Sequence, residues 1–187
     1  IVKPVRVRAK KSPRLYLGIP KKLNLTSGAL VMKLGENNKI IQSAATSSAS
    51  VARFHEGFAL PLANNRRVTS VFGEVRITGG REIRHNGVDL GAPAGASVGA
   101  INDGVVSRAY FDDIYGNSVI VDHGAGIISL YMHLSSILVK EGQGVKKGTL
   151  VGRVGSTGYS EHPHLHFSVK ISGVSVDPLS LVRNFRD

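Results

Sequence analysis

The chain has 187 residues, of which 42% are hydrophobic and 20% are charged. This length suits one domain with an appendage or at most two small domains, and the composition excludes a chain that is disordered throughout. No run of residues approaches the ~18 consecutive apolar residues of a membrane-spanning helix. The sequence contains no cysteine. Disulfides, thiol catalysis and thiolate metal sites are therefore excluded, and the chemistry of histidine, carboxylate and serine remains.

The net charge of +11 is concentrated at the N-terminal end of the chain. Residues 1–35 hold nine of the 24 Lys and Arg residues and no acidic residue, because the first acid is Glu36. A basic segment of this kind is attracted to anionic polymers or lipid surfaces, and it is equally typical of the solvated face of a preceding domain. We expect no nucleic-acid binding, since Tyr16 is the only aromatic residue in this segment and no binding motif is present.

Residues 1–50 are predicted to form a short basic β-like segment outside the main domain. Apolar and basic residues alternate over residues 5–8, and the turn residues Gly18 and Pro20 follow the run at 15–17, a pattern of short strands and turns. Residues 43–50 are rich in Ser and Ala, which predicts a linker. Because the chain starts at Ile1 without an initiator Met, we expect it to be cut from a longer protein.

Residues 54–187 are predicted to form one mostly β domain. Glycine interrupts almost every window of about eleven residues after Phe54, so the stripes of amphipathic helices are hard to find there. Strands of short length with frequent turns are typical of an antiparallel sheet, sandwich or barrel. The β-like runs between the glycines are residues 98–101, 104–108, 118–121, 127–132, 149–154 and 164–171.

Five of the seven histidines fall in three short clusters, two of which can supply metal ligands. His85 and Asp89 are four residues apart, and on an extended chain both side chains project from the same face. Pro163 excludes a helix interior, so His164 and His166 also share one face of a strand, with apolar residues on the opposite face.

Two neutral imidazoles and one carboxylate form a three-ligand zinc set whose fourth position is left to water, as in hydrolytic sites. Zinc would lower the pKa of that water from about 15.7 toward about 7. The residues alone leave open whether His164 or His166 is the second imidazole ligand. A histidine that is not a ligand is available as a general base or to stabilise an oxyanion, and His133 is the third member of this group.

These motifs, in this order, resemble the lysostaphin/LytM-type zinc metalloendopeptidases that cut bacterial peptidoglycan. The resemblance extends from about residue 58 to residue 178. It rests on His85-x-x-x-Asp89, Gly91-Ala92-Pro93-x-Gly95, Tyr131-x-His133-Leu134-Ser135, Gly142-Gln143-x-Val145-x-x-Gly148-x-x-x-Gly152, Gly155-Ser156-Thr157-Gly158 and Pro163-His164-Leu165-His166-Phe167.

The resemblance implies an all-β domain of two antiparallel sheets, with a narrow groove over one zinc ion. By position, His85, Asp89 and His166 match the zinc ligands of the family. His133 and His164 match its two catalytic histidines, which assist the attack of a zinc-activated water. The implied activity is an endopeptidase acting on stem or cross-link peptides of peptidoglycan. Its implied location is the periplasm, the cell wall or the extracellular space, where the basic segment would meet an anionic wall or membrane surface.

Two alternatives stand beside a freely active endopeptidase. One is a non-catalytic LytM-like module that binds the cell wall or activates an amidase, although degenerate members of that kind are expected to lack metal ligands. The other is an endopeptidase that is autoinhibited by the basic segment lying over the groove. Which peptidoglycan bond is cut does not follow from the sequence.

Three further histidines are assigned no chemistry. His162 departs from the small residue that the family usually has before its Pro-His-Leu-His run, and a bend at Pro163 is expected to turn it to the rim of the groove. His123 is expected to end a strand and to form local hydrogen bonds, and His55 is expected to lie at the surface.

Overall fold

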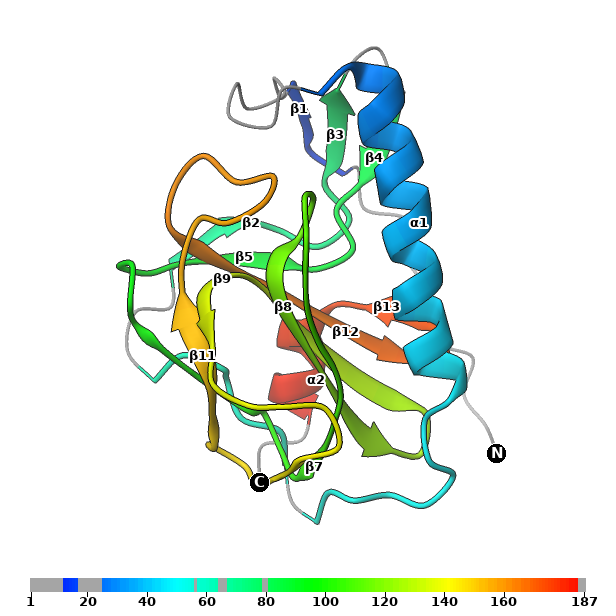
Figure 1. Cartoon of the computed structure of the whole chain (residues 1–187), viewed down its shortest axis with the longest axis vertical. Helices are drawn as coiled ribbons and strands as arrows, with labels where there is room; N and C mark the ends of the chain where they lie inside the picture. Colours follow the sequence, from blue (N-terminus) through cyan, green and yellow to red (C-terminus); the bar gives the residue numbers. More distant parts are fainter. Residues whose placement is uncertain (1–11, 17–24, 56, 64–66, 79–80, 185–187) are drawn as a thin grey trace.

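The computed structural model describes residues 12–16, 25–55, 57–63, 67–78 and 81–184, and strands dominate this part of the chain (Figure 1). Its helices are α1 (Ser27–Thr46) and α2 (Pro178–Asn184). Its strands are β1 (Arg14–Tyr16), β2 (Arg67–Ser70), β3 (Val75–Thr78), β4 (Arg81–Arg84), β5 (Val88–Gly91), β6 (Ser97–Gly99), β7 (Gly104–Asp112), β8 (Gly116–Gly124), β9 (Ile127–Ile137), β10 (Gly144–Val145), β11 (Leu150–Val154), β12 (His164–Ile171) and β13 (Val174–Val176). The all-β class predicted for the domain is confirmed.

The larger sheet has the strand order β10-β7-β8-β9-β12-β5-β2, and its strand pairs are antiparallel. Strand β9 pairs with β12 through residues 127–132 and with β11 through residues 134–137, and β11 in turn pairs with β6. The strand therefore passes from one group of strands to another at His133. This change of partner creates the two-layered arrangement that the sequence predicted.

The main hydrophobic core lies between these layers. Leu165, Phe167 and Val169 of β12 are fully buried in it, as the alternation of apolar residues along this strand predicts. Tyr131 is buried in the same core, and its ring lies 5.6 Å from that of Phe167. The opposite face of β12 is consequently free to carry polar side chains.

Over residues 27–46, the predicted β-like segment and the start of the predicted linker are corrected by helix α1. Residues 43–46 are its last turn and not a linker. Thr26 caps its N-terminus by accepting a hydrogen bond from the Ala29 N–H, and the residues it buries recur at helical spacing: Leu30, Asn37, Ile41, Ala44 and Ala45. Composition alone suggested a linker, but Ala is the best helix former, and tertiary packing of this buried stripe stabilises the helix.

Helix α1 packs on the face of the larger sheet that the main core leaves open. Ile41, Ala44 and Ala45 form a second hydrophobic cluster with side chains of β8 and β9, among them Ile120 and Leu130. Figure 1 shows the helix running along one side of the molecule, from the strands β3 and β4 toward the end of β13. The strand expected near residue 15 is present as β1, which pairs with β3 in a small sheet of order β1-β3-β4.

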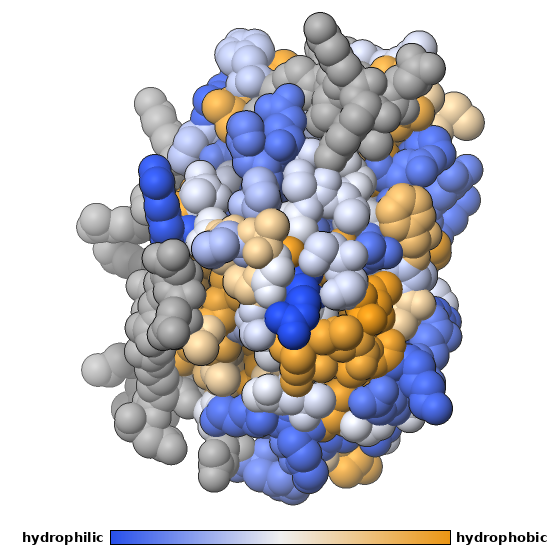
Figure 2. Space-filling model, turned by 60° about the vertical axis from the view of Figure 1, so that its left-hand side comes forward, coloured by the Kyte–Doolittle hydropathy of each residue, from blue (hydrophilic) through white to orange (hydrophobic). Residues whose placement is uncertain are grey.

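The surface of the molecule is mixed in character. Figure 2 shows one face on which hydrophilic side chains cover the upper and lower parts and apolar side chains gather between them. Neither of the two described helices combines the length and the apolar character that crossing a membrane would require.

Candidate metal centre

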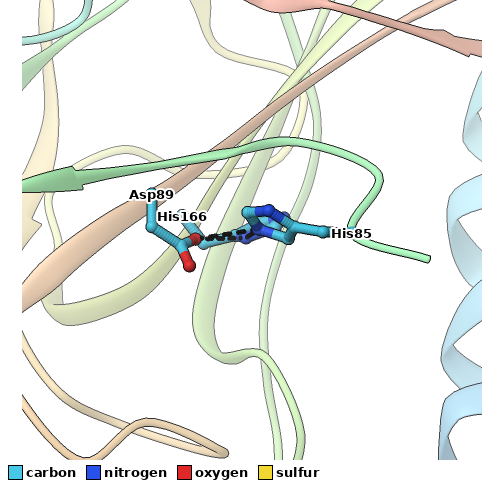
Figure 3. Close-up of side chains that lie close together, drawn as sticks. All are labelled: His85, Asp89 and His166. Carbon is cyan, nitrogen blue, oxygen red and sulfur yellow. Dashed lines mark hydrogen bonds and ion pairs between the residues drawn. The ribbon is translucent and has the colours of Figure 1, made fainter. Parts of the chain in front are cut away.

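Three buried side chains from neighbouring elements converge on one point. His85 follows β4, Asp89 lies in β5 and His166 lies in β12. Asp89 Oδ1 lies 3.0 Å from His85 Nε2 and 2.8 Å from His166 Nδ1, and these two nitrogens are 3.0 Å apart. Figure 3 shows the ring of His85 and the carboxylate of Asp89 pointing toward one another. The structure thus brings together all three residues that the resemblance assigned to metal binding.

Strand register and a glycine position these groups. His166 lies directly opposite Asp89 in the ladder between β5 and β12, so both side chains leave the same face of the sheet. The loop that carries His85 passes very close to β12 at Gly87. A Cβ at this glycine would lie 2.5 Å from Phe167 O and 2.9 Å from His166 Nε2. Only glycine allows this approach.

The outer nitrogen of each imidazole is hydrogen-bonded. His85 Nδ1 donates to the carbonyl oxygen of Val71 at 2.9 Å, and His166 Nε2 lies 2.9 Å from Ser168 Oγ. Because a carbonyl only accepts, the proton of His85 is on Nδ1 and the lone pair of Nε2 faces Asp89. Outer hydrogen bonds of this kind fix the tautomer and orientation of metal-binding histidines.

An arginine holds the other oxygen of the carboxylate. Arg76 Nη2 lies 2.5 Å from Asp89 Oδ2, so Oδ1 alone faces the two imidazoles. The same guanidinium contacts Glu74 Oε1 at 3.2 Å and Ser70 Oγ at 2.9 Å. Glu74 and Ser70 are themselves buried and hydrogen-bonded to one another. Arg76 is therefore fixed in a network and balances two buried carboxylates.

Burial and hydrogen bonding set the charges of this cluster. Burial lowers the pKa of His166 to about 4 even though Asp89 acts in the opposite direction. Burial alone would raise the pKa of Asp89, but the neighbouring imidazoles of His166 and His85 hold that pKa well below its ordinary value. At neutral pH the cluster therefore presents a neutral imidazole at His166 and an ionised carboxylate.

His133 reaches the same face of the sheet through an irregularity in β9. The pairing between β8 and β9 shifts register between Val119 and Asn117, and His133 has a φ of +62°. A non-glycine residue in this region of backbone conformation is strained, and such strain concentrates at functional sites. His133 Nδ1 donates to Thr157 O at 2.8 Å, which leaves Nε2 to face the site.

His164 lies beside this group, as the alternation along β12 predicts. Its ring is 5.0 Å from the ring of His133, and its Nε2 lies 3.7 Å from Asp89 Oδ1. Its Nδ1 donates to the backbone carbonyl of His162 at 2.8 Å. His162 is exposed, as expected for a residue at the rim, and it orients His164 through this backbone oxygen.

Two hollows meet at the centre. One, of about 280 Å³, is lined by Asp89, His164 and the loop at 159–163. The other, of about 140 Å³, is lined by His85, His166 and helix α1. Arg76, His133 and Tyr159 line both. The two hollows therefore share part of their lining beside the cluster, where the resemblance implies a groove.

The two remaining histidines are placed as expected. His123 is fully buried, and its ring nitrogens lie 2.7 Å from Asp103 O and 2.8 Å from Ser129 Oγ. Burial lowers its pKa, and its hydrogen bonds are those of a structural residue. His55 is exposed. Neither lines the hollows at the centre.

Comparison with known proteins agrees with this geometry. The model of peptidase family M23 matches residues 83–178, which is about half of the chain and includes His85, Asp89, His133, His164 and His166. The chain belongs to peptidase family M23. The resemblance to lysostaphin/LytM-type enzymes is thereby confirmed.

Several M23 relatives match over a similar region. Peptidoglycan DD-endopeptidase ShyC of Vibrio cholerae is 37% identical over 115 residues, which cover 62% of this chain and 25% of the relative. A zinc-containing peptidase of Vibrio cholerae has a TM-score of 0.62 at 35% identity, covering 66% of this chain and 39% of that one. Lysostaphin of Staphylococcus simulans has a TM-score of 0.59 at 32% identity, covering 70% of this chain and 54% of that one. The chain spans about a quarter of the length of the curated relatives it matches.

The sequence did not point to three residues that contact the M23 centre. Ser168 shares a strand face with His164 and His166, so the same alternation would have placed it behind the metal cluster. Tyr115 stacks on His166 at a ring distance of 6.4 Å, and Arg76 binds Asp89. The sequence spacing of Tyr115 and Arg76 from the histidines does not predict these contacts. Arg76 comes to the centre on the small sheet, and Tyr115 comes to it in the turn between β7 and β8.

Proposed function

We propose that this chain hydrolyses peptide bonds in the stem or cross-link peptides of bacterial peptidoglycan, with one zinc ion held by His85, Asp89 and His166. The observation that carries this proposal is the convergence of these three donors beside two more imidazoles, at the point where two hollows meet. Family membership and the similarity to ShyC, a peptidoglycan DD-endopeptidase, support the substrate class.

The donor set fits zinc. Its three ligand atoms lie within 4.8 Å of one another, and they comprise the imidazole nitrogens and carboxylate oxygen that zinc prefers. Tetrahedral bonds of about 2.0–2.1 Å place ligand atoms about 3.3 Å apart, a few tenths of an ångström more than the 2.8–3.0 Å spacings here. When bound, zinc would supply Lewis-acid polarisation and a water of lowered pKa.

His133 and His164 are suited to move protons at the reacting carbonyl. Each ring donates from Nδ1 to a backbone carbonyl, so the lone pair of its neutral form is on Nε2 and faces the groove. Burial lowers the pKa of His133 well below its ordinary value, and the nearby His164 and His166 act electrostatically in the same direction. Its Nε2 is therefore unprotonated at neutral pH and can accept a proton. A protonated imidazole can then donate to the leaving amine.

The groove would hold an extended peptide across the centre. Its two hollows share Arg76, His133 and Tyr159 in their lining, so a peptide occupying both would pass beside His133 and His164. Holding the scissile bond in a fixed position relative to these side chains would lower the activation free energy, because the entropy of bringing the groups together is lost on binding. Action on this substrate places the protein in the periplasm, at the cell wall or in the extracellular space.

The charge of the basic N-terminal segment carries no further proposal. Residues 1–11 and 17–24, which include most of its lysines and arginines, lie outside the described residues. Of the described ones, Arg14 pairs with Glu82 and Lys33 with Asp113. Attraction to an anionic wall or membrane surface stays a prediction from the sequence.

The decisive experiment combines zinc analysis with peptidoglycan digestion on one sample, before and after chelation. We expect one zinc per chain and a chelator-sensitive release of muropeptides, whose masses identify the bond that is cut. Bound zinc without cleavage would favour the non-catalytic module. A protein that binds no zinc would contradict the proposal.

A partly closed enzyme is a second candidate. Leu15 of β1 lines the groove next to His164 and Pro163, so the N-terminal segment reaches the place where substrate would lie. Removing residues 1–16 should then raise the cleavage rate. Helix α1 must be kept in this experiment, because its loss would expose the cluster around Ile120 and Leu130. An unchanged rate would exclude this form of autoinhibition.

A further inference from the structure

The hollow beneath helix α1 is more than an extension of the metal centre. It runs from His166 along the polar face of β12 to Lys170, and Leu30 and Leu34 of α1 cover it. Its volume of about 140 Å³ is large enough for several water molecules or a small peptide side chain. The helix thus encloses one half of the groove with an apolar wall.

The charges that line this cavity are of one sign. Arg76, Arg84 and Lys170 are among its lining residues, and no Asp or Glu among the described residues lines it. The other hollow differs, because Glu161 and Asp89 line it. Because Arg76 also lines that hollow and is paired with Asp89 and Glu74, Arg84 and Lys170 supply the positive charge of the cavity under α1.

Lys170 is the cation at the far end of the cavity. It is half-buried, and its Nζ donates to Ser175 Oγ at 3.0 Å and to Gly173 O at 3.3 Å. An ammonium has three donors, so one donor is left for a ligand after these two contacts. Burial lowers the pKa of Lys170, and neither of these two hydrogen-bond partners is a carboxylate. Its position is that of a partly desolvated cation lacking a counterion in the described part of the chain.

The distance from Lys170 to the metal centre matches that between a scissile bond and a substrate group a few residues away. Lys170 lies four residues beyond His166 on the same strand face, which is a rise of about 13 Å. An extended peptide advances about 3.3 Å per residue, and the long side chain of lysine shortens the remaining distance. A group within about three residues of the scissile bond would reach the ammonium.

We propose that this cavity is a carboxylate subsite, in which Lys170, assisted by Arg84, binds a free carboxylate of the peptide whose scissile bond lies at the metal centre. The inference rests on the proposed function. The carboxylate belongs either to the C-terminus of the peptide or to a side chain. Leu30 and Leu34 would contact a small apolar side chain next to it.

The test compares three forms of one soluble muropeptide: the free acid, the form amidated at the C-terminal carboxylate and the form amidated at a side-chain carboxylate. The zinc-loaded wild-type protein should cleave the free form with a lower KM than one of its two amidated forms, and the form that loses affinity identifies the carboxylate. A charge-assisted hydrogen bond contributes enough for a change in KM of about 10-fold. Equal KM values for all three forms would overturn the subsite.

Substitutions then assign the effect to the cavity. Lys170→Gln should raise KM for the free acid by about 10-fold and leave kcat within about two-fold. The KM for the amidated form that had lost affinity should not change. Lys170→Arg should restore most of the affinity. Lys39→Gln, at an exposed position of α1, is the matched control and should change nothing. Equal losses on both substrates would instead indicate a structural role of Lys170 and overturn the proposal.

A separate binding measurement distinguishes failure of this inference from failure of the proposed function. Calorimetric titration of the zinc-loaded protein with an uncleaved peptide, as free acid and as amide, needs no turnover. Preference for the acid that Lys170→Gln abolishes would support the subsite even if no peptidoglycan bond is cut. Active enzyme without such a preference would remove the subsite and leave the function standing.

Discussion

Arg76 and Asp89 form an ion pair directly behind the candidate metal centre. The guanidinium binds one oxygen of the carboxylate at 2.5 Å, and the other oxygen faces the two imidazoles. The pair divides the carboxylate into an outer and an inner oxygen, so a single oxygen of Asp89 faces the two imidazoles. The orientation of the centre thus depends on a residue of the small sheet.

Arg76→Met should weaken zinc binding. The substitution keeps most of the length of the side chain but removes the hydrogen bonds to Asp89, Glu74 and Ser70. Loss of an outer partner of a metal ligand typically lowers metal affinity by about 10- to 100-fold, and we expect a loss of about this size. Competition with a chromogenic chelator measures the change. Arg14→Met removes an exposed pair with Glu82 and is the control. Unchanged zinc affinity in Arg76→Met would show that the ion pair does not orient the ligand.

His166→Ala and His164→Ala should separate metal binding from catalysis. His166→Ala removes a nitrogen of the three-donor set, so zinc content and activity should both be lost. His164→Ala should retain zinc and lose most of the rate, by about 10²- to 10⁴-fold if this imidazole transfers a proton. Zinc analysis and muropeptide release on both variants provide the measurement. Cell-wall cleavage by His166→Ala would end its assignment as a ligand.

Gly87→Ala should disturb the metal centre without changing any ligand. The added Cβ would press against Phe167 O, His166 Nε2 and Ser168 Oγ, so the His85 loop and β12 would have to separate. We expect a loss of zinc affinity of at least about 10-fold, comparable to the loss of an outer partner. Gly95→Ala, where a Cβ meets open space but φ is +83°, controls for a general effect of glycine replacement. Normal zinc affinity in Gly87→Ala would show that the loop can shift at no cost to the centre.

Gly35→Ala should stabilise the protein. Gly35 lies within helix α1, its added Cβ would meet no atom within 4 Å, and its backbone is not left-handed. Alanine in a helix interior is favoured over glycine by about 0.5–1 kcal/mol. Chemical denaturation should show an increase of about this size in the free energy of unfolding, with unchanged zinc content. A decrease would indicate that α1 does not retain this conformation in solution.

The metal-free protein should lose stability as the pH falls below about 6.5. Burial lowers the pKa of His166 to about 4, so between these two values the unfolded chain binds more protons than the folded one, and unfolding becomes more favourable as the pH decreases. Burial also lowers the pKa values of His133 and His123, which acts in the same direction. Melting temperatures measured from pH 7 to pH 4.5 test this, and His166→Gln should reduce the slope. A melting temperature independent of pH would contradict it.

Much of the strand pattern and of the metal cluster follows from local sequence patterns. The alternation of His164, Leu165 and His166 separates a polar from an apolar face, because the side-chain period of a strand is two. The strand β12 indeed extends from residue 164 to residue 171, the run that its composition predicted. The four-residue spacing of His85 and Asp89 likewise predicts that these two side chains meet. The pairing of β12 with β5 then brings His166 to the same point.

The contributions of His133, Arg76 and helix α1 depend instead on contacts between distant parts of the chain. A regular β9 would direct His133 to the same face as Tyr131, and the irregularity at its positive φ turns it toward the site instead. Arg76 meets Asp89 because β3 folds over the larger sheet, a contact between residues with no periodic relation. Local composition predicts a β-like segment and a linker where helix α1 lies, because composition alone is a weak guide to structure. Its burial against β8 and β9, a long-range contact, makes it a helix and closes one half of the groove.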